Sequence, residues 1–268
     1  MTAARAAATI GIMVTGVLLD IAGVLTEAGA ALPGGPEAVA RLREAGLPVG
    51  YLTNTTRKPK RRVVEDLAAA GYPVDPRAVT TPAAAAVEWL RDNGYAPHLL
   101  SHPDLNEDFP ASGSDRPVAV VVGDAGEAFT YAALNAAFRH LADGAPFLAL
   151  AANRVFSDAD GVLSLDAGAF VAALDYASGT APIVLGKPSR AFFDRAVESL
   201  GCDPGEVAMV GDDAEADVAG ALRAGIAQAW LVRTGKYRDG DEDRVDPAPT
   251  GVVADIGEAV DRLLGGAG

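Results

Sequence analysis

Short apolar runs alternate along this chain with stretches of helical periodicity, and this alternation constrains the fold more than any other feature. The clearest apolar runs are residues 17–19, 49–52, 207–210 and 229–232. Strands separated by helices are typical of a parallel sheet, because the chain needs a crossover before each new strand. The first three runs end in polar or acidic residues, and ligands of doubly wound sheets bind outside such carboxyl ends. The sequence therefore predicts an α/β fold with a ligand site at one sheet edge.

A separate block lies between two proline-marked joints, at Pro82 and Pro182. It contains two strand-like runs, each followed by a helical pattern, which is enough for a small α/β unit of its own. Two chain crossings at such joints fit an inserted unit better than a tandem domain. We therefore expect a discontinuous core of residues 1–81 plus 181–268, and an inserted α/β cap over residues 82–180.

Composition excludes several classes of protein. The formal charge of −14 argues against a nucleic-acid or anionic-membrane partner. Cys202 is the only cysteine, so no disulfide can form within the chain, and a reducing compartment, the cytoplasm, is expected. The apolar start is interrupted by Gly11, Thr15 and Gly16, which argues against a signal peptide, and no run has the length of a membrane span.

Asp20 directly follows the first apolar run and is the candidate nucleophile. A carboxylate can attack phosphorus when a cation reduces its repulsion with the phosphoryl group. Gly23 allows the following loop to turn tightly toward a ligand. Taken alone, an aspartate at a strand end is more often structural, so the remaining strand ends decide the interpretation.

The second strand end and a later loop offer groups that suit a phosphate. Thr53 and Asn54 can donate a hydroxyl and an amide hydrogen to phosphoryl oxygens, although a helix cap would use the same residues. Lys187 lies between Gly186 and Pro188 in a chain that has only four lysines. A buried ammonium there would balance the charge of Asp20 and of the transferring phosphoryl group.

The third strand end is acidic, with Asp212 and Asp213 followed by Asp217. Carboxylates of this kind suit Mg²⁺, which binds oxygen ligands and keeps several waters. Acids at a helix N-terminus also stabilise the helix dipole, which is the competing structural explanation. In combination with Asp20 and Lys187, however, the set supplies a nucleophile, a cation and a metal ligand, and so predicts a phosphoryl site.

These four elements resemble the four motifs of the haloacid dehalogenase (HAD) superfamily, and the inserted block resembles the α/β cap of its class IIA phosphatases. The matching segments are Asp20-Ile21-Ala22-Gly23-Val24, Leu52-Thr53-Asn54, Gly186-Lys187-Pro188 and Gly211-Asp212-Asp213 with Asp217. Further matches at residues 187–193 and 232–238 narrow the resemblance to one group of phosphatases. The resemblance extends over residues 17–264. It implies a HAD-type, Rossmann-like core with a parallel sheet.

The resemblance also implies roles for individual residues. Asp20 would form an aspartyl-phosphate with help from Lys187 and Asp212 as catalytic residues. Mg²⁺ would be held by Asp20, the Ala22 backbone carbonyl and Asp212, while Asp213 and Asp217 would orient metal-bound waters or Lys187. The phosphate would contact Asp20, Ile21, Ala22, Thr53, Asn54 and Lys187. The partner would be a small phosphorylated substrate selected by the cap, and a homodimer is implied by analogy alone.

One position departs from the family pattern. Most HAD phosphatases have a second aspartate two residues after the nucleophile, as general acid and base, and this chain has Ala22. Such proton transfer contributes about 10²–10⁴-fold in rate. Its loss matters least when the leaving group departs easily, so the sequence predicts preference for pyrophosphate, phosphoramidates, acyl phosphates or aryl phosphates.

Two other functions remain open. Phosphonoacetaldehyde hydrolases also have alanine at this position, but they use a cap lysine, and residues 82–180 contain none. A phosphate- or phosphoprotein-binding module that has lost turnover would explain Ala22, yet it would not need the nucleophile Asp20.

Three further features have provisional interpretations. Asn153, Arg154 and Phe156 are cap candidates for substrate contact, although an ordinary loop explains them equally well. The basic run from Arg57 to Arg62 is interpreted as a solvated helix face rather than a phosphopeptide dock. Asp124 follows Gly123 as Asp212 follows Gly211, and we interpret it as a helix N-cap because nothing beside it completes a phosphate site.

Overall fold

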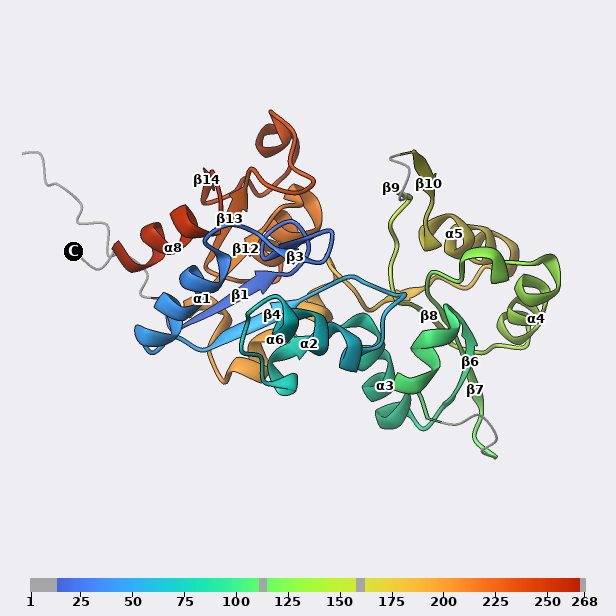
Figure 1. The fold of residues 1–268 in the computed structure, drawn as a ribbon. Coiled ribbons are helices and arrows are strands. Elements are labelled where there is room, and N and C mark those ends of the chain that lie inside the picture. The colour runs from blue at the N-terminus through green and yellow to red at the C-terminus, as the bar shows by residue number, and fades with distance from the viewer. Residues whose placement is uncertain (1–13, 111–114, 158–161, 266–268) are drawn as a thin grey trace, which may run out of the picture.

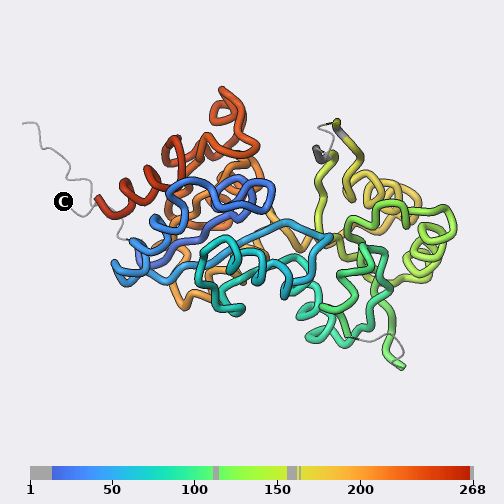
Figure 2. Tube along the Cα trace, viewed as in Figure 1, coloured from blue at the N-terminus to red at the C-terminus, as the bar shows by residue number. Residues whose placement is uncertain are grey.

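A computed structural model describes residues 14–110, 115–157 and 162–265 of the chain. The described residues form two parallel sheets, each covered by helices on both faces, and Figure 1 shows these two parts side by side. In the trace of Figure 2 the blue and orange-red segments gather on one side and the green and yellow segments on the other. Within the described residues, no helix combines the length and apolar character needed to cross a membrane.

The larger sheet contains six parallel strands in the order β14-β13-β12-β1-β4-β5. Their bounds are Gly251–Val253 (β14), Gln228–Val232 (β13), Val207–Gly211 (β12), Gly16–Asp20 (β1), Val49–Leu52 (β4) and Val79–Thr80 (β5). The nucleophile candidate therefore lies at the end of a central strand, between β12 and β4. A parallel sheet confirms the predicted fold class.

Neighbouring residues of β1 face opposite sides of this sheet, because side chains alternate along a strand. Val17 and Leu19 pack against one group of helices, and Leu18 packs against another. The first group comprises α1 (Gly35–Glu44), α2 (Lys60–Ala69) and α8 (Ile256–Gly265). The second comprises α6 (Arg190–Leu200), the π-helical segment η5 (Ala214–Ala219) and α7 (Gly220–Arg223). Both faces of the central strands are thus buried, and their parallel pairing brings their carboxyl ends to the same edge of the sheet.

The smaller sheet contains four parallel strands in the order β11-β8-β7-β6. These strands are Ile183–Val184 (β11), Phe147–Ala149 (β8), Val118–Val122 (β7) and Ala96–Leu100 (β6). Helix α3 (Pro82–Asn93) and the 3₁₀ segment η2 (Pro103–Asp108) cover one face, and α4 (Tyr131–Ala142) and α5 (Ala167–Ser178) cover the other. Because β11 belongs to this sheet, the return to the larger sheet comes after residue 184, slightly later than the expected joint at 181.

Two short hairpins complete the described fold. Strands β2 (Thr26–Glu27) and β3 (Ala30–Ala31) pair directly after the nucleophile loop, and β9 (Val155–Ser157) pairs with β10 (Leu163–Leu165) in the smaller part. The remaining elements are the 3₁₀ segments η1 (Pro76–Ala78), η3 (Gly126–Ala128), η4 (Pro204–Glu206) and η6 (Asp241–Arg244). The apolar patterns did not reveal the hairpins, β14 or α8, because these elements are short or lie outside the strongly patterned segments.

The basic run after β4 contacts the smaller part of the molecule, so its interpretation as a solvated helix face was wrong in part. The Arg57 guanidinium forms an ion pair with Asp124. The Lys60 backbone N–H donates to Asp108 Oδ2 at 2.9 Å, and Arg61 Nε lies 3.0 Å from Glu107 Oε1. Helix α2 also begins at Lys60 rather than Arg57, because Pro59 adopts an extended conformation at its N-cap.

Candidate active site

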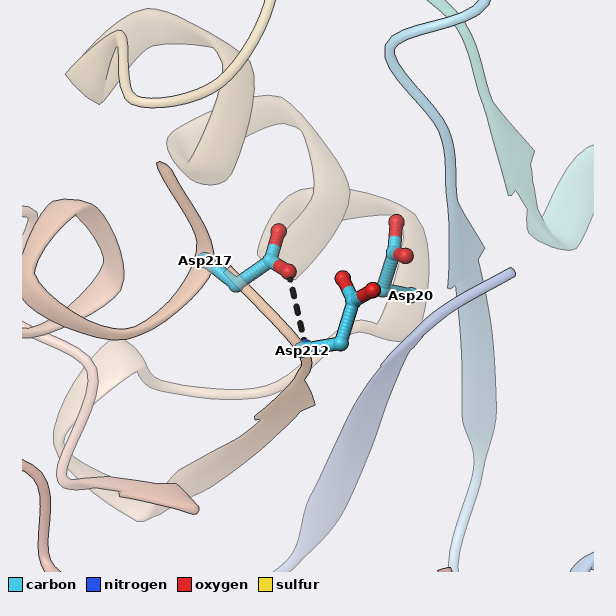
Figure 3. Close-up of side chains that lie close together, drawn as sticks. All are labelled: Asp20, Asp212 and Asp217. Atoms are coloured by element: carbon cyan, nitrogen blue, oxygen red, sulfur yellow. Dashed lines mark hydrogen bonds between the residues drawn. The ribbon is translucent and has the colours of Figure 1, made fainter. Parts of the chain in front are cut away.

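Three carboxylates converge where β1 and β12 end. Asp20 is the last residue of β1, and Asp212 follows β12, which pairs with β1 in parallel. Asp217 lies on η5, the segment that starts directly afterwards. Their exposed fractions are 5%, 3% and 1%, and each offers an oxygen within 4.8 Å of the others. Figure 3 shows the three side chains pointing toward one another. The sequence prediction that these residues meet is therefore supported by the geometry.

Asp217 is fixed by the backbone of the same loop. Its Oδ2 accepts the N–H groups of Asp212 and Asp213, each at 3.1 Å. Its Oδ1 lies 2.6 Å from Lys187 Nζ. The Asp217 carboxylate therefore lies against the lysine on one side and the loop backbone on the other, and it is also within reach of a cation bound between Asp20 and Asp212.

Lys187 connects the three acids to the loop that precedes α6. Its Nζ forms an ion pair with Asp20 Oδ1 as well as with Asp217. Burial lowers the pKa of the Lys187 ammonium, but the two carboxylates outweigh burial and hold the pKa above its usual value. The lysine therefore remains charged and supplies a fixed positive charge next to the nucleophile.

Asn54 makes a contact that the sequence did not predict. Its Nδ2 donates to the Lys187 carbonyl at 2.9 Å, and its Oδ1 accepts the Lys187 N–H at 2.8 Å. This pair of hydrogen bonds joins loops 133 residues apart in sequence. The Asn54 amide thus positions the lysine. Its second Nδ2 hydrogen is not used by these bonds, so the phosphate contact stays a prediction.

The Thr53 hydroxyl is available to bind phosphate, whereas the Ile21 backbone N–H is already used. The buried Thr53 Oγ1 accepts the Thr55 N–H at 3.1 Å, which leaves the hydroxyl hydrogen for a ligand. The Ile21 N–H donates to the Leu52 carbonyl at 3.0 Å and so extends the pairing of β1 with β4. The predicted phosphate contact through Ile21 was wrong for its N–H group.

Asp213 was expected near the metal or Lys187, and it also caps η5. Its Oδ1 accepts the N–H groups of Glu215 and Ala216 at 3.2 and 2.9 Å, and its Oδ2 lies 3.6 Å from Lys236 Nζ. A helix N-terminus with unpaired N–H groups thus takes up Oδ1 of Asp213. The residue also lines the cavity that contains Asp20 and Lys187, so its orienting role stays a prediction.

The loop after β13 completes the site and was missing from the predicted set. The Lys236 backbone N–H donates to Asp212 Oδ2 at 2.8 Å, and the Thr234 hydroxyl donates to the Gly23 carbonyl. A Cβ atom on Gly23 or Gly235 would collide with the Asp212 carboxylate, so glycine is required where these loops meet. The polar residues after β13 were visible in the sequence, but their contacts with Asp212 and Gly23 were not.

A cavity of about 210 Å³ opens above these groups. Its lining includes Asp20, Lys187 and Asp212 together with Thr53 and Ala22, so the predicted catalytic residues do face one space. From the smaller part of the molecule, Asn153 joins the lining.

The other two cap candidates differ from Asn153. Arg154 is exposed, and within the described residues it is not part of this lining. Phe156 lies in β9, and its side chain falls outside the described residues.

Electrostatics favour a cation between Asp20 and Asp212. Burial, reinforced by the nearby acids, raises the pKa of Asp20 to about 7 although Lys187 opposes the shift. Burial and Asp217 likewise raise the pKa of Asp212 to about 6. Three buried carboxylates against one buried ammonium leave excess negative charge, which a divalent cation would relieve.

The available oxygens fit a metal ion. The contacts described above use Oδ1 of Asp20 and Oδ2 of Asp212, which leaves one oxygen on each. Around Ala22, the hairpin bonds use the Ile21 carbonyl and the Gly23 N–H, so the Ala22 carbonyl is not taken by them. Asp20, Asp212 and the Ala22 backbone, the ligands that the family resemblance implies, therefore each have an oxygen that could hold a metal.

Fold and site together define a class of hydrolase with an aspartate at the end of a central parallel strand. Residues 17–125 match the family model "Haloacid dehalogenase-like hydrolase", and residues 184–259 match a HAD-hydrolase-like model. The chain is 40% identical over 257 residues to the phospholysine phosphohistidine inorganic pyrophosphate phosphatase of Rattus norvegicus, covering 94% of each chain. It is 41% identical over 248 residues to the haloacid dehalogenase-like hydrolase domain-containing protein 2 of Bos taurus, covering 92% and 95%.

Solved structures agree with this assignment. The p-nitrophenyl phosphatase of Archaeoglobus fulgidus superposes with a TM-score of 0.84 at 26% identity, covering 93% of this chain and 99% of that one. NagD of Escherichia coli gives a TM-score of 0.81 at 25% identity, covering 92% and 98%. The chain belongs to the haloacid dehalogenase-like hydrolase family. Its activity class is that of a HAD-type phosphatase, as its relatives' names and the preserved aspartate site indicate.

Proposed function

We propose that this chain is a Mg²⁺-dependent phosphatase that transfers a phosphoryl group to Asp20 and prefers substrates with easily departing leaving groups. One observation carries the proposal: a buried, lysine-paired aspartate lies beside Ala22, which can neither give nor take a proton. The site thus has the parts needed for nucleophilic attack and lacks the usual proton donor.

Each residue contributes a separate task. An Asp20 carboxylate oxygen attacks phosphorus, so an O–P bond forms as the bond to the leaving group breaks, and water later hydrolyses the aspartyl-phosphate. Lys187, held by Asp217 and Asn54, offsets the negative charge that builds up between nucleophile and phosphoryl group. The Thr53 hydroxyl donates to a phosphoryl oxygen.

Asp20, Asp212 and the Ala22 carbonyl would hold the metal ion. Bound Mg²⁺ supplies positive charge that reduces repulsion between the carboxylate and the phosphoryl group. Mg²⁺ is proposed over softer metals because these ligands are all oxygen atoms.

Ala22 determines which substrates turn over quickly. Without a general acid, an alkoxide must leave unprotonated, which costs about 10²–10⁴-fold in rate. Pyrophosphate, phosphoramidates, acyl phosphates and aryl phosphates have leaving groups that need less help. The name of the rat relative refers to phospholysine, phosphohistidine and inorganic pyrophosphate, whose P–N and P–O–P bonds belong to this class.

The test measures phosphate release with Mg²⁺ from pyrophosphate, phospholysine, phosphohistidine, an aryl phosphate and several alkyl phosphates. The wild type is compared with Asp20→Asn, Ala22→Asp and the matched control Ala22→Asn, which has a similar shape but transfers no proton. We expect release from the labile substrates alone, its loss in Asp20→Asn, and alkyl phosphate hydrolysis only in Ala22→Asp.

Two results would contradict the proposal. Fast hydrolysis of alkyl phosphates by the wild type would show that Ala22 does not limit the leaving group. No release from any substrate by the wild type, with turnover restored by Ala22→Asp, would favour the alternative of a phosphate- or phosphoprotein-binding module.

Three further expectations accompany this proposal. The partner is a small phosphorylated compound rather than a nucleic acid or a membrane, since the charge of −14 repels both. The cytoplasm is proposed because Cys202 has no cysteine partner within the chain. A homodimer is proposed by analogy with the family.

A further inference from the structure

A second cavity of about 220 Å³ adjoins the active site. It lies between the β2–β3 hairpin and helix α2, and Ala22, Thr53 and Thr55 line both this cavity and the one that holds Asp20. Among the described residues, these three alone are common to the two linings. A group bonded to a phosphoryl at Asp20 therefore has a neighbouring space of similar size on the far side of Ala22 and Thr53.

The walls of this second cavity are mainly apolar. Ile21, Val63 and Leu67 contribute buried side chains, and Ala22 contributes an exposed methyl group. An apolar stem of a few carbon atoms or a single ring would gain from burial against such walls.

The polar end of the cavity is formed by Lys58 and Asp66, which pair with each other and both line it. Lys58 Nζ lies 2.6 Å from Asp66 Oδ2, and the Lys58 side chain is 55% exposed. Arg62 Nε lies 3.4 Å from the other Asp66 oxygen, so this carboxylate is shared between two cations. Because an ammonium has three donors, Lys58 can bind a further anionic group while it keeps Asp66.

Ala22 makes the shared wall neutral. The usual aspartate at this position would place a carboxylate between the two cavities, where it would repel an anionic leaving group on its way to Lys58. The methyl group of Ala22 removes that repulsion. The loss of the general acid and the opening of an anion-compatible passage are thus consequences of one residue.

We propose that the second cavity binds the leaving group of the substrate, and that Lys58 selects leaving groups with an apolar stem and an anionic end. This inference rests on the proposed phosphatase function and specifies its substrate class. The anionic end can be a carboxylate or a second phosphate, since both accept from an ammonium in the same way.

The test uses two aryl phosphates of nearly equal shape, 4-carboxyphenyl phosphate and 4-carbamoylphenyl phosphate. The quantity compared is the ratio of their kcat/KM values in each variant, because their different intrinsic reactivities cancel between variants. We expect Lys58→Ala to lower this ratio about fivefold, as for one partly exposed charge-assisted contact, mainly through KM. Lys58→Arg keeps the charge and should restore most of the ratio.

Arg62→Ala is the matched control. Arg62 also pairs with Asp66 on the same helix, but it is not among the described residues that line the cavity. Its removal should leave the ratio unchanged. A ratio that is equal in wild type and Lys58→Ala, or that falls equally in Arg62→Ala, would overturn the inference.

Failure of this inference is distinguishable from failure of the proposed function. Pyrophosphate and acetyl phosphate report on Asp20 chemistry without an aryl stem. If the wild type hydrolyses them and Asp20→Asn does not, the phosphatase function stands whatever the aryl ratio shows. If neither is hydrolysed, the proposed function fails first.

Discussion

A Gly-Asp pair lies at the carboxyl end of two strands of this molecule, yet only one of the two pairs belongs to the catalytic site. Strand β12 leads into Gly211-Asp212, and strand β7 leads into Gly123-Asp124. Both strands are buried members of parallel sheets, and both aspartates are buried. The local sequence and the local backbone therefore do not decide which carboxylate can take part in phosphoryl chemistry.

The difference lies in what the neighbouring elements bring. Asp212 faces two further carboxylates and a buried lysine, in a site with excess negative charge. Asp124 instead pairs with Arg57, its N–H donates to Thr56 Oγ1 at 3.0 Å, and its Oδ1 accepts the Gly126 N–H at 2.9 Å. All of its described partners neutralise or cap it, so Asp124 joins the two parts of the molecule. Its interpretation as the N-cap of the following helix is corrected, since Thr130 caps α4.

Replacing each aspartate by asparagine should show the largest contrast. Asp212→Asn removes a metal ligand and should lower kcat/KM for pyrophosphate about 10³-fold, because charge stabilisation at the reacting group is lost. Asp124→Asn should change kcat/KM less than about threefold. Equal losses in the two variants, measured with Mg²⁺ in excess and with both proteins folded, would break the comparison.

Removing the cationic side chain, Lys187 in the catalytic site or Arg57 beside Asp124, should lower the stability of the protein by different amounts. Lys187→Met leaves Asp20 and Asp217 buried without their partner, and we expect a loss of about 3 kcal/mol in the free energy of unfolding at pH 8. Arg57→Met should cost much less, because the Arg57 side chain is partly exposed.

Urea unfolding without added metal measures both variants. For Lys187→Met the loss should shrink at pH 5, where Asp20 can take up a proton. A loss that is the same at pH 5 and pH 8 would argue against an electrostatic cause.

The affinity for Mg²⁺ should depend on pH through Asp20 and Asp212, and Asp124 should not contribute to this dependence. In the metal-free protein the pKa of Asp20 is raised to about 7 and that of Asp212 to about 6, so protons compete with Mg²⁺ as the pH falls. The apparent Mg²⁺ affinity should be nearly full at pH 8 and about twentyfold weaker at pH 6, by simple proton competition at the two carboxylates.

The same shifts predict how stability responds. Between the ordinary pKa of 3.8 and the raised value, the folded state binds more protons than the unfolded state, so metal-free stability should fall as pH rises through this window. Isothermal titration and thermal unfolding check both statements, and Asp124→Asn should show the same profiles as wild type. A pH-independent affinity would contradict the assignment of Asp20 and Asp212.

The smallest expected effect concerns the ion pair between Arg57 and Asp124. Arg57→Ala should lower the free energy of unfolding by about 1 kcal/mol, because the ion pair is partly exposed on the arginine side. A double-mutant cycle with Asp124→Ala should give a coupling of about 0.5–1 kcal/mol, whereas Arg57 with Asp212 should give none. Additive losses of unfolding free energy at Arg57 and Asp124 would show that their contact does not stabilise the protein.

The sequence alone was sufficient to predict the elements that have a strong hydrophobic pattern. Buried strands such as β1, β4 and β12 are short apolar runs bounded by turns, and the polar residues after them share one sheet edge by topology alone. The meeting of Asp20 with Asp212 was therefore predictable.

Contacts between distant loops were not predictable from one sequence. Asn54 and Lys187 are 133 residues apart, and nothing local indicates that the amide would bind the lysine backbone. The capping bond of Asp213 was not predicted, because an acid before a helix fits a cap and a metal site equally well. Residues on β9 and its loop could not be oriented, because side-chain direction there depends on packing.

The central claim is that Asp20 accepts the phosphoryl group. The most direct measurement mixes excess enzyme and Mg²⁺ with ³²P-labelled pyrophosphate, quenches the single turnover in acid, and locates the label by peptide mapping after hydroxylamine treatment of a parallel sample. The account predicts transient, hydroxylamine-sensitive label on the peptide that contains Asp20, absent from Asp20→Asn and present in Asp124→Asn. Labelled phosphate released at the wild-type rate by Asp20→Asn, with no labelled peptide in either protein, would contradict it.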